Sequence, residues 1–252
     1  MSFITVNDLN IHYEEYGDKG RNVLLLHGWG QNTEMMAFIG EHLKDRFHIY
    51  NIDFPGFGKS DEPKETWGCP EYTSFLREYC TRLGIEDPVI IGHSFGCRIA
   101  LRYAALYPVY KMVLTGAAGL RDKRTLQWYV RTYSYKLAKK LLSFKVFSAL
   151  REKMAEKAGS EDYRNATGVM RSTFVKVVND DVRDLLPQIE TETLLVFGEK
   201  DDATPVSKGK EMEKLMKDAT LVIFENDGHY AYINQAQRFC RVLDAFFRED
   251  YV

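Results

Sequence analysis

A serine framed by glycines stands between a strand-like run and a helix-like one. The pentapeptide Gly92–Gly96 reads GHSFG and fits the pattern G-x-S-x-G. In that context the serine sits on a strained turn with positive φ, and its hydroxyl projects above a sheet. Small residues on both sides let the strand and the helix pass closely. The pattern predicts that Ser94 is a nucleophile at a helix N-terminus, where peptide dipoles favour developing negative charge.

A serine hydroxyl is a weak nucleophile at neutral pH, so it needs a general base that a carboxylate orients. Of the six histidines, His229 follows a later apolar run and is the predicted base. His93 lies inside the pentapeptide, and we expect its side chain to point away from the pocket into a packed or hydrogen-bonded position. His27 is expected to organise a loop at the pocket floor. The other three, at positions 12, 42 and 48, are expected to be surface or structural residues.

Three carboxylates are candidates for the partner of the base. We predict Asp201, because it stands three residues after Gly198 and four before Pro205, in the segment that follows another apolar run. Asp202 is expected to cap the next helix or to face solvent, and Asp227 to belong to a turn. The chain order serine, aspartate, histidine is the one expected when the three groups meet at the carboxyl ends of parallel strands.

Two backbone N–H groups are predicted to hold a developing oxyanion. One belongs to Phe95, directly after the serine, and the other to Trp29, in the loop His27–Gly30. Such donors contribute roughly 3 kcal/mol each to transition-state stabilisation. That loop is neither G-x-G-x-x-G nor a Walker loop, which argues against a nucleotide site. No histidine spacing suits a metal, so we expect no metal and no cofactor.

The elements that must position these groups alternate along most of the chain. Apolar runs at 23–26, 47–52, 88–91, 112–114, 193–197 and 220–224 are predicted strands, with helices at 74–83, 98–106 and 235–247. Buried runs joined by helices indicate a parallel, doubly wound α/β sheet. Residues 1–16 predict an antiparallel edge hairpin that turns near Asn7-Asp8. Apolar residues at helical spacing over 126–148 predict a helical insertion at 121–190, with the α/β core at 1–120 and 191–252.

Charge follows the same division. Residues 121–190 carry 15 Lys and Arg against 9 Asp and Glu, a net of +6, whereas the rest of the chain is at −8. A solvated helical face explains this pattern, and a basic cap that attracts anionic substrates is the alternative. Reversing the charges of Arg121, Lys123 and Arg124 tests the second interpretation. The net charge of the whole chain, −2, argues against a nucleic-acid binder.

At this point the sequence resembles the α/β-hydrolase superfamily, in its capped serine-hydrolase branch. The resemblance spans essentially the whole chain and rests on five segments, which are 27–30, 53–60 (DFPGFGKS), 92–96, 198–205 and 228–229. It implies that the insertion forms a cap over the pocket. Because Ser94 stands where haloalkane dehalogenases and epoxide hydrolases carry aspartate, the chain does not resemble those relatives. Cys97 replaces the usual small residue after Gly96 and is expected to be a buried small hydrophobe.

The resemblance implies acyl transfer to water, with hydrolysis of a carboxylic ester as the first choice. Cleavage of a carbon–carbon bond in a diketo acid is the runner-up, since such relatives often carry an aromatic residue after the histidine, as Tyr230 does here. Thioester, lactone or amide cleavage, and a ligand receptor on the same scaffold, stay open. Trp128, Tyr133 and Tyr230 are predicted to line an apolar pocket, although core packing is the alternative for each.

The remaining expectations concern the setting of the protein. The N-terminus lacks the pattern of a secretion signal, and no apolar stretch approaches the ~18 residues of a membrane span. The four cysteines show no CxxC pairing and are expected to be reduced thiols of a cytoplasmic protein. We expect a small-molecule substrate, no nucleic-acid partner and a monomer or homodimer.

Overall fold

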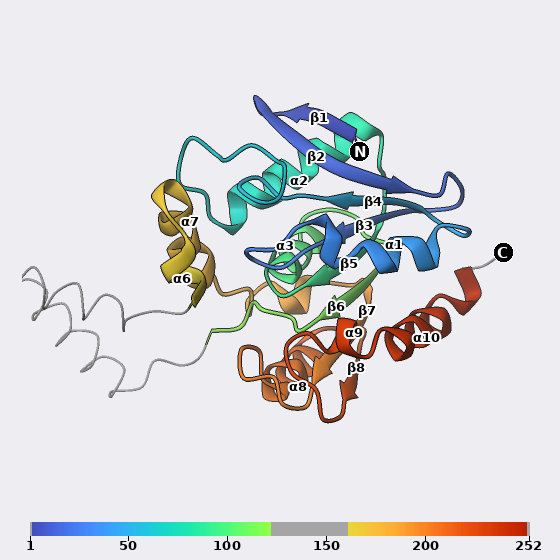
Figure 1. Cartoon of the computed structure of the whole chain (residues 1–252). Helices are drawn as coiled ribbons and strands as arrows, with labels where there is room; N and C mark the ends of the chain where they lie inside the picture. The colour runs from blue at the N-terminus through green and yellow to red at the C-terminus, as the bar shows by residue number, and fades with distance from the viewer. Residues whose placement is uncertain (1, 122–160, 251–252) are drawn as a thin grey trace, which may run out of the picture.

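One eight-stranded sheet organises the computed structural model, which describes residues 2–121 and 161–250 (Figure 1). The strand order is β1-β2-β4-β3-β5-β6-β7-β8. From β4 to β8 all neighbours are parallel, whereas β1 with β2 and β2 with β4 are antiparallel. The strands are β1 (Ser2–Val6), β2 (Leu9–Tyr16), β3 (Asn22–Leu26), β4 (His48–Ile52), β5 (Val89–His93), β6 (Lys111–Thr115), β7 (Glu192–Gly198) and β8 (Ala219–Phe224). The predicted α/β fold and its parallel core are therefore confirmed.

The antiparallel edge is also confirmed. β1 and β2 pair through a two-residue turn in which Asn7 has a φ of 51° and Asp8 a φ of 60°. A tight hairpin of this kind needs positive φ at both central residues, and Asn and Asp tolerate that conformation better than most side chains. The two residues thus determine where the chain reverses.

Helices cover both faces of the sheet, because the side chains of each buried strand alternate between the faces. In β3, Leu24 and Leu26 join the core beneath α2 (Cys69–Leu83), α3 (Phe95–Ala104) and α8 (Val206–Leu215). Val23 and Leu25 point to the opposite core, beneath α1 (Ala37–Leu43), α9 (Ala231–Asn234) and α10 (Ala236–Phe246). The short helices η1 (Thr33–Met35), η3 (Leu186–Gln188) and η4 (Arg248–Asp250) lie in connections or at the C-terminal end.

The helix predictions hold with shifted bounds. α2 begins five residues earlier than the segment 74–83, at Cys69, and is capped by Gly68, whose N–H donates to the Glu71 carboxylate. The last predicted helix, 235–247, corresponds to α10, and Gln235 separates α10 from the short α9 before it. η1 and α1 had no predicted counterpart.

Between β6 and β7 the chain forms α6 (Glu161–Asn165) and α7 (Gly168–Val178). Several hydrogen bonds attach α7 and the residues after it to the core. Thr173 Oγ1 accepts from the Trp67 N–H over 3.1 Å, Lys176 Nζ donates to the Thr66 carbonyl over 2.8 Å, and Arg98 donates to a carbonyl beyond α7. The helical spacing predicted over 126–148 lies outside the described residues, and the bounds of the insertion stay a prediction.

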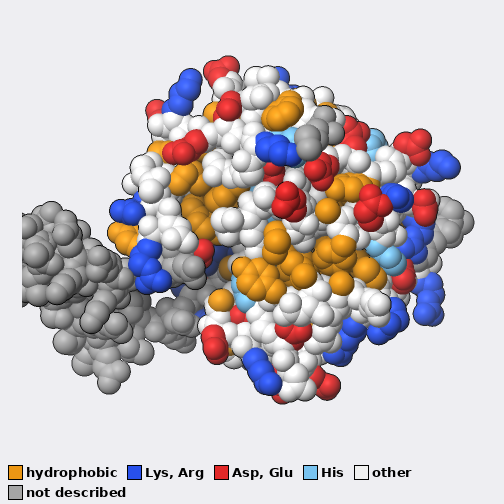
Figure 2. All heavy atoms as spheres, in the orientation of Figure 1, with side chains coloured by type: hydrophobic (Ala, Val, Ile, Leu, Met, Phe, Trp, Pro, Cys, Tyr) orange, Lys and Arg blue, Asp and Glu red, His pale blue; other side chains and the backbone are white. Residues whose placement is uncertain are grey.

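The surface is mixed in charge. Figure 2 shows hydrophobic side chains gathered across the middle of one face, with charged side chains of both signs around them. This agrees with a net charge close to zero. Within residues 2–121 and 161–250, no helix combines the length and the apolar character needed to cross a membrane.

Candidate active site

Ser94 occupies the turn between β5 and α3 with a φ of 48° and a ψ of −103°, a conformation that costs free energy in a residue with a side chain. The backbone around it is crowded. A Cβ atom on Gly96 would collide with the Leu26 carbonyl oxygen, and one on Gly92 would lie 3.1 Å from the Cys97 nitrogen. The two glycines therefore let β5 and α3 pack closely enough to form the turn, as the sequence predicts.

The structure places Asp201, rather than Asp202 or Asp227, against His229. The His229 Nδ1–H donates to Asp201 Oδ2 over 2.7 Å. Asp202 is exposed. Asp227 instead accepts hydrogen bonds from the Gly228 N–H and from the side chains of Asn234 and Gln235, at the junction of α9 and α10, as a turn residue would.

The Asp201 carboxylate is 3% exposed and fully hydrogen-bonded. Its Oδ1 accepts from the N–H groups of Ala203 and Thr204, both over 2.8 Å, and its Oδ2 accepts from Thr204 Oγ1 over 2.7 Å. Burial alone would raise the pKa of this carboxyl, but the hydrogen bonds from His229 and Thr204 outweigh burial and hold the pKa below 3.8. Asp201 is therefore an ionised group that can stabilise an imidazolium.

Thr204 is a member of this group that the sequence did not reveal. Its hydroxyl oxygen lies 3.3 Å from His229 Nδ1 while donating to Asp201. The only signal available was its place three residues after Asp201, which is also typical of an ordinary turn.

Ser94 and His229 line the same cavity of about 310 Å³, although no hydrogen bond joins these two described residues. The His229 ring lies over Gly116, where a Cβ atom would approach it to 3.1 Å. Since Nδ1–H is donated to Asp201, Nε2 is the ring's acceptor. Catalytic hydrogen bonds are often long in unliganded sites, so this arrangement is compatible with proton transfer from Ser94.

The loop that carries Trp29 is held by the buried His27 ring. His27 Nε2 accepts from the Phe54 N–H over 3.0 Å, so Nδ1 carries the proton and donates to the Gly28 carbonyl over 2.7 Å. Burial lowers the pKa of His27 to about 4, which keeps the ring neutral. The Gly28 carbonyl and the Trp29 N–H belong to one peptide group and point in opposite directions. His27 thereby fixes the orientation of the Trp29 N–H.

Trp29 and Phe95 both line the cavity, and their rings meet edge to face at 5.5 Å. Phe95 opens α3, so its N–H is one of the unpaired donors at the helix N-terminus. Both residues predicted to supply oxyanion donors are thus at the cavity, beside Ser94.

His93 differs in part from its prediction. Its Nδ1–H donates to the Thr115 carbonyl over 3.1 Å, as expected of a hydrogen-bonded residue, yet the ring also lines the cavity. It lies 4.8 Å from the His229 ring, centroid to centroid. Burial, followed by the neighbouring His229, lowers the pKa of His93 to about 3. The ring therefore acts as a neutral support beneath His229.

The apolar wall of the cavity comes partly from α7. Phe174, Val177 and Val178 line it, and the Phe174 ring packs on Trp29 at 5.1 Å. Tyr230, predicted as a pocket residue, also lines it, 43% exposed. Trp128 and Tyr133, predicted for the same wall, lie outside the described residues. A further hollow of about 500 Å³ shares Trp29 and Tyr230 with this cavity and opens toward α6.

The remaining singled-out residues have structural partners. His12 is buried and bonded to Asp53 over 2.8 Å, His42 to Asp244 over 3.0 Å, and His48 to Glu15 over 3.1 Å. The four cysteines are unpaired. Cys97 is fully buried, and burial raises the pKa of its thiol far above the ordinary value of 9.0. The described residues contain no cluster of His, Cys, Asp or Glu that suits a metal.

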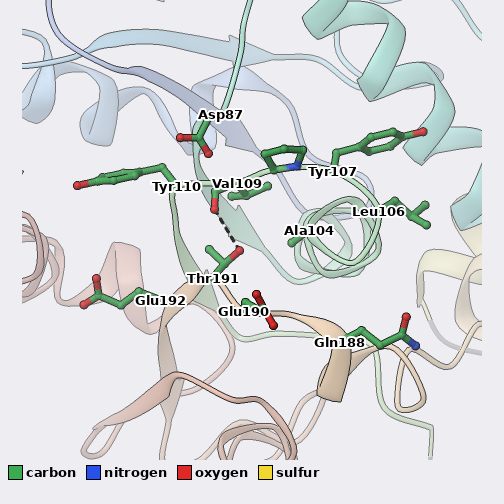
Figure 3. Close-up of a pocket in the computed structure, with 11 residues that line it drawn as sticks. Asp87, Ala104, Leu106, Tyr107, Val109, Tyr110, Gln188, Glu190, Thr191 and Glu192 are labelled. Atoms are coloured by element: carbon green, nitrogen blue, oxygen red, sulfur yellow. Dashed lines mark hydrogen bonds between the residues drawn. The ribbon is translucent and has the colours of Figure 1, made fainter.

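Another hollow, of about 500 Å³, lies at the opposite end of the sheet, near the amino ends of β5, β6 and β7 (Figure 3). None of its described lining residues is a serine, cysteine or histidine. Its acids are already paired, Asp87 with Arg21 over 2.9 Å and Glu192 with Lys111 over 3.3 Å. The groups capable of nucleophilic chemistry therefore gather at the carboxyl ends of the strands.

Comparison with known proteins agrees with this architecture. A family model described as the alpha/beta hydrolase fold matches residues 21–236. The AB hydrolase superfamily protein YisY of Bacillus subtilis is 26% identical, over 96% of this chain and 97% of that protein. The 2-hydroxy-6-oxo-6-phenylhexa-2,4-dienoate hydrolase of Comamonas testosteroni is also 26% identical, over 97% of this chain and 93% of that protein.

The solved structure of an esterase from Exiguobacterium antarcticum superposes with a TM-score of 0.77 at 23% identity, and covers 98% of this chain and 99% of that one. At 23% sequence identity this structural similarity shows only that the two proteins share a fold. The family match extends over most of the chain and over all the segments that form the cavity. The chain therefore belongs to the α/β-hydrolase fold family and is an enzyme of that family.

Proposed function

We propose that the protein is a serine hydrolase that cleaves carboxylic esters through an acyl-enzyme. The observation that carries the proposal is the Asp201–His229 pair, 2.7 Å between Oδ2 and Nδ1, in the same cavity as a serine with a φ of 48° at the start of α3. A nucleophile, a base and an orienting carboxylate in one cavity have the composition of an acyl-transfer site.

In the proposed reaction Ser94 Oγ attacks the ester carbonyl while His229 Nε2 takes the hydroxyl proton. Asp201 stabilises the resulting imidazolium. The N–H groups of Trp29 and Phe95 hold the oxyanion of the tetrahedral intermediate. His229 then protonates the departing alcohol, and a water molecule, deprotonated by His229, hydrolyses the acyl-enzyme and restores Ser94.

The lining of the cavity supports a small, largely apolar acyl or aryl group, because Phe174, Val177 and Val178 form one wall. The position of α7 also supports the assignment of 121–190 as a cap over the site. The unpaired cysteines support a reducing, cytoplasmic location.

The test uses 4-nitrophenyl acetate and butyrate together with a fluorophosphonate label. The wild-type protein should release 4-nitrophenol and take up one label, and Ser94→Ala should lose both, with a fall in kcat of at least about 10³-fold. The exposed Asp202→Asn serves as a matched control for handling and folding. Turnover by Ser94→Ala at the wild-type rate would refute the mechanism.

Hydrolysis of a carbon–carbon bond in a diketo acid is the second candidate. It is favoured by the relative from Comamonas testosteroni, whose name specifies a 2-hydroxy-6-oxo dienoate, and by Tyr230 directly after the histidine. Rapid turnover of such a diketo acid beside poor turnover of both esters would support it. Ligand binding without turnover of any of these compounds would support a receptor on the same scaffold.

A further inference from the structure

A partly buried arginine side chain lines the cavity one helical turn from Ser94. Arg98 lies on α3, four residues after the serine, a spacing that places two residues on the same side of a helix. It lines the cavity together with Ser94 and His229. The acyl-transfer mechanism gives it no role, and the sequence did not single it out.

The hydrogen bonds of Arg98 leave most of its donors unused. A guanidinium carries five N–H groups. The one hydrogen bond of this side chain in the described part of the chain runs from Nη1 to the Asp180 carbonyl, over 2.7 Å. No nitrogen of Arg98 is among the buried atoms that lack a partner, in contrast to Nε of Arg102. The unused donors of Arg98 are therefore not sealed off from solvent, and the side chain lines the cavity.

The charge of Arg98 also lacks a direct counter-ion. Among residues 2–121 and 161–250, no carboxylate forms an ion pair with it. Asp180 gives Arg98 its backbone carbonyl, while its carboxylate pairs with Arg102 over 2.6 Å. Burial lowers the pKa of Arg98 from its ordinary value, but a guanidinium stays protonated in proteins.

A guanidinium with unused donors beside apolar side chains attracts an anion strongly. Hydrogen bonds between two charged groups are weakly screened in such a place. Phe174, Val177 and Val178 supply the apolar surroundings. Asp162 is a carboxylate on the same lining, but it is exposed, so solvent and salt screen its repulsion.

We propose that Arg98 is a carboxylate-binding residue of the substrate pocket, so that the preferred substrate carries a carboxylate a few carbon atoms from the bond that is cleaved. This inference rests on the proposed function and narrows its substrate class. The fixed hydrogen bond to Asp180 holds the guanidinium in place, and the remaining N–H groups receive the carboxylate.

The experiment compares two esters with the same leaving group, the neutral 4-nitrophenyl butyrate and the anionic mono-4-nitrophenyl glutarate. Arg98→Gln should lower kcat/KM for the anionic ester about 10- to 100-fold more than for the neutral one, mainly through KM, which is the effect of losing one or two charged hydrogen bonds. Arg98→Lys, which keeps the charge without the planar fork, should retain part of the preference.

Arg102→Gln is the matched control, because it removes the other guanidinium that holds Asp180 without touching the cavity lining. It should change both esters by the same factor. If Arg98→Gln and Arg102→Gln lower both esters alike, Arg98 only anchors the segment after α7 and the proposal is overturned.

Two further measurements test anion binding separately from effects of the variants on folding and on turnover. With wild-type protein, butyrate should inhibit hydrolysis of the neutral ester at concentrations about tenfold lower than butyramide, and equal inhibition would overturn the proposal. With Ser94→Ala protein, calorimetry should detect glutarate binding that Arg98→Gln removes. Glutarate binding through Arg98 in a protein that cleaves neither ester would refute the proposed function alone. Ester turnover without any charge preference would refute the subsite alone.

Discussion

The hydroxyl of Thr204 offers the sharpest test of how the Asp201–His229 pair works. It supplies one of the four hydrogen bonds that the Asp201 carboxylate accepts. Thr204→Val keeps the shape of the side chain and the backbone N–H bond but removes the hydroxyl. Because a hydrogen bond to a charged group contributes about 1.5–3 kcal/mol and three partners stay in place, we expect the lower value. About 1.5 kcal/mol lost from the transition state corresponds to a roughly tenfold lower kcat.

The assay measures steady-state hydrolysis of 4-nitrophenyl butyrate, and unfolding in urea measures the stability of the same variants. Thr193→Val is the control, since Thr193 is a buried residue of β7 whose hydroxyl donates to the Thr191 carbonyl over 2.8 Å at the other end of the strand. Both variants should lose about 1 kcal/mol of unfolding free energy, but only Thr204→Val should lose activity, and Thr204→Ser should regain it. Equal kcat values for the wild type, Thr193→Val and Thr204→Val would refute the idea that this hydroxyl orients the pair.

Two further predictions concern the frame around the site. Gly96→Ala should destabilise the fold by at least about 3 kcal/mol, because its Cβ would collide with the Leu26 carbonyl. Gly84 has a φ of 65° but open space around it, so Gly84→Ala should cost only about 1 kcal/mol in urea unfolding. Equal losses of unfolding free energy in the two variants would contradict this reasoning. Burial lowers the pKa of His27 to about 4 and of His93 to about 3, so below pH 6.5 both rings take up protons when the protein unfolds. The contribution of these neutral rings to the unfolding free energy is therefore complete above pH 6.5 and is lost as the pH drops. At pH 5 each ring should cost about 2 kcal/mol relative to pH 7, and His93→Asn should remove one of the two losses. An unfolding free energy that does not depend on pH would show that folding leaves the pKa of both rings unchanged.

The parallel core was predictable because its strands are buried on both faces. Every residue of β5 and β6 is buried, and this shows in the sequence as short apolar runs between turn residues. The hairpin was predictable for a different reason, since Asn7 and Asp8 are among the few residues that accept the required positive φ.

The misplaced helix bounds have local causes. α2 starts at Cys69, directly after Gly68, because the Glu71 side chain and Pro70 define its first turn, a signal that the amphipathic pattern of 74–83 does not contain. The helix expected at 235–247 agrees with α10 to within one residue at each end. Gln235, with a φ of −113° and a ψ of 45°, separates it from α9, which the periodicity did not indicate.

The chemical groups of the site were easier to predict than the residues that support them. Ser94, Asp201 and His229 stand in local patterns, so their types and neighbours mark them. Thr204 and Arg98 depend on which groups the fold brings next to them, and the sequence around each reads as an ordinary turn or helix. The role of His27 likewise becomes definite only when Phe54, which follows β4, supplies its second hydrogen bond.

The position at which the chain leaves the sheet has an evolutionary consequence. After β6 the chain passes Gly119, and it comes back to the same place at Val182, whose N–H donates to the Gly119 carbonyl over 3.0 Å, so the segment that lines one wall of the cavity departs and returns at adjacent points. Closing a loop between neighbouring points costs little more when the loop is longer, since the entropy grows only with the logarithm of its length. Insertions and replacements there leave the strand ladder intact. Substrate preference in this lineage can therefore diversify as a separate module, while the reactive groups on the framework stay constant.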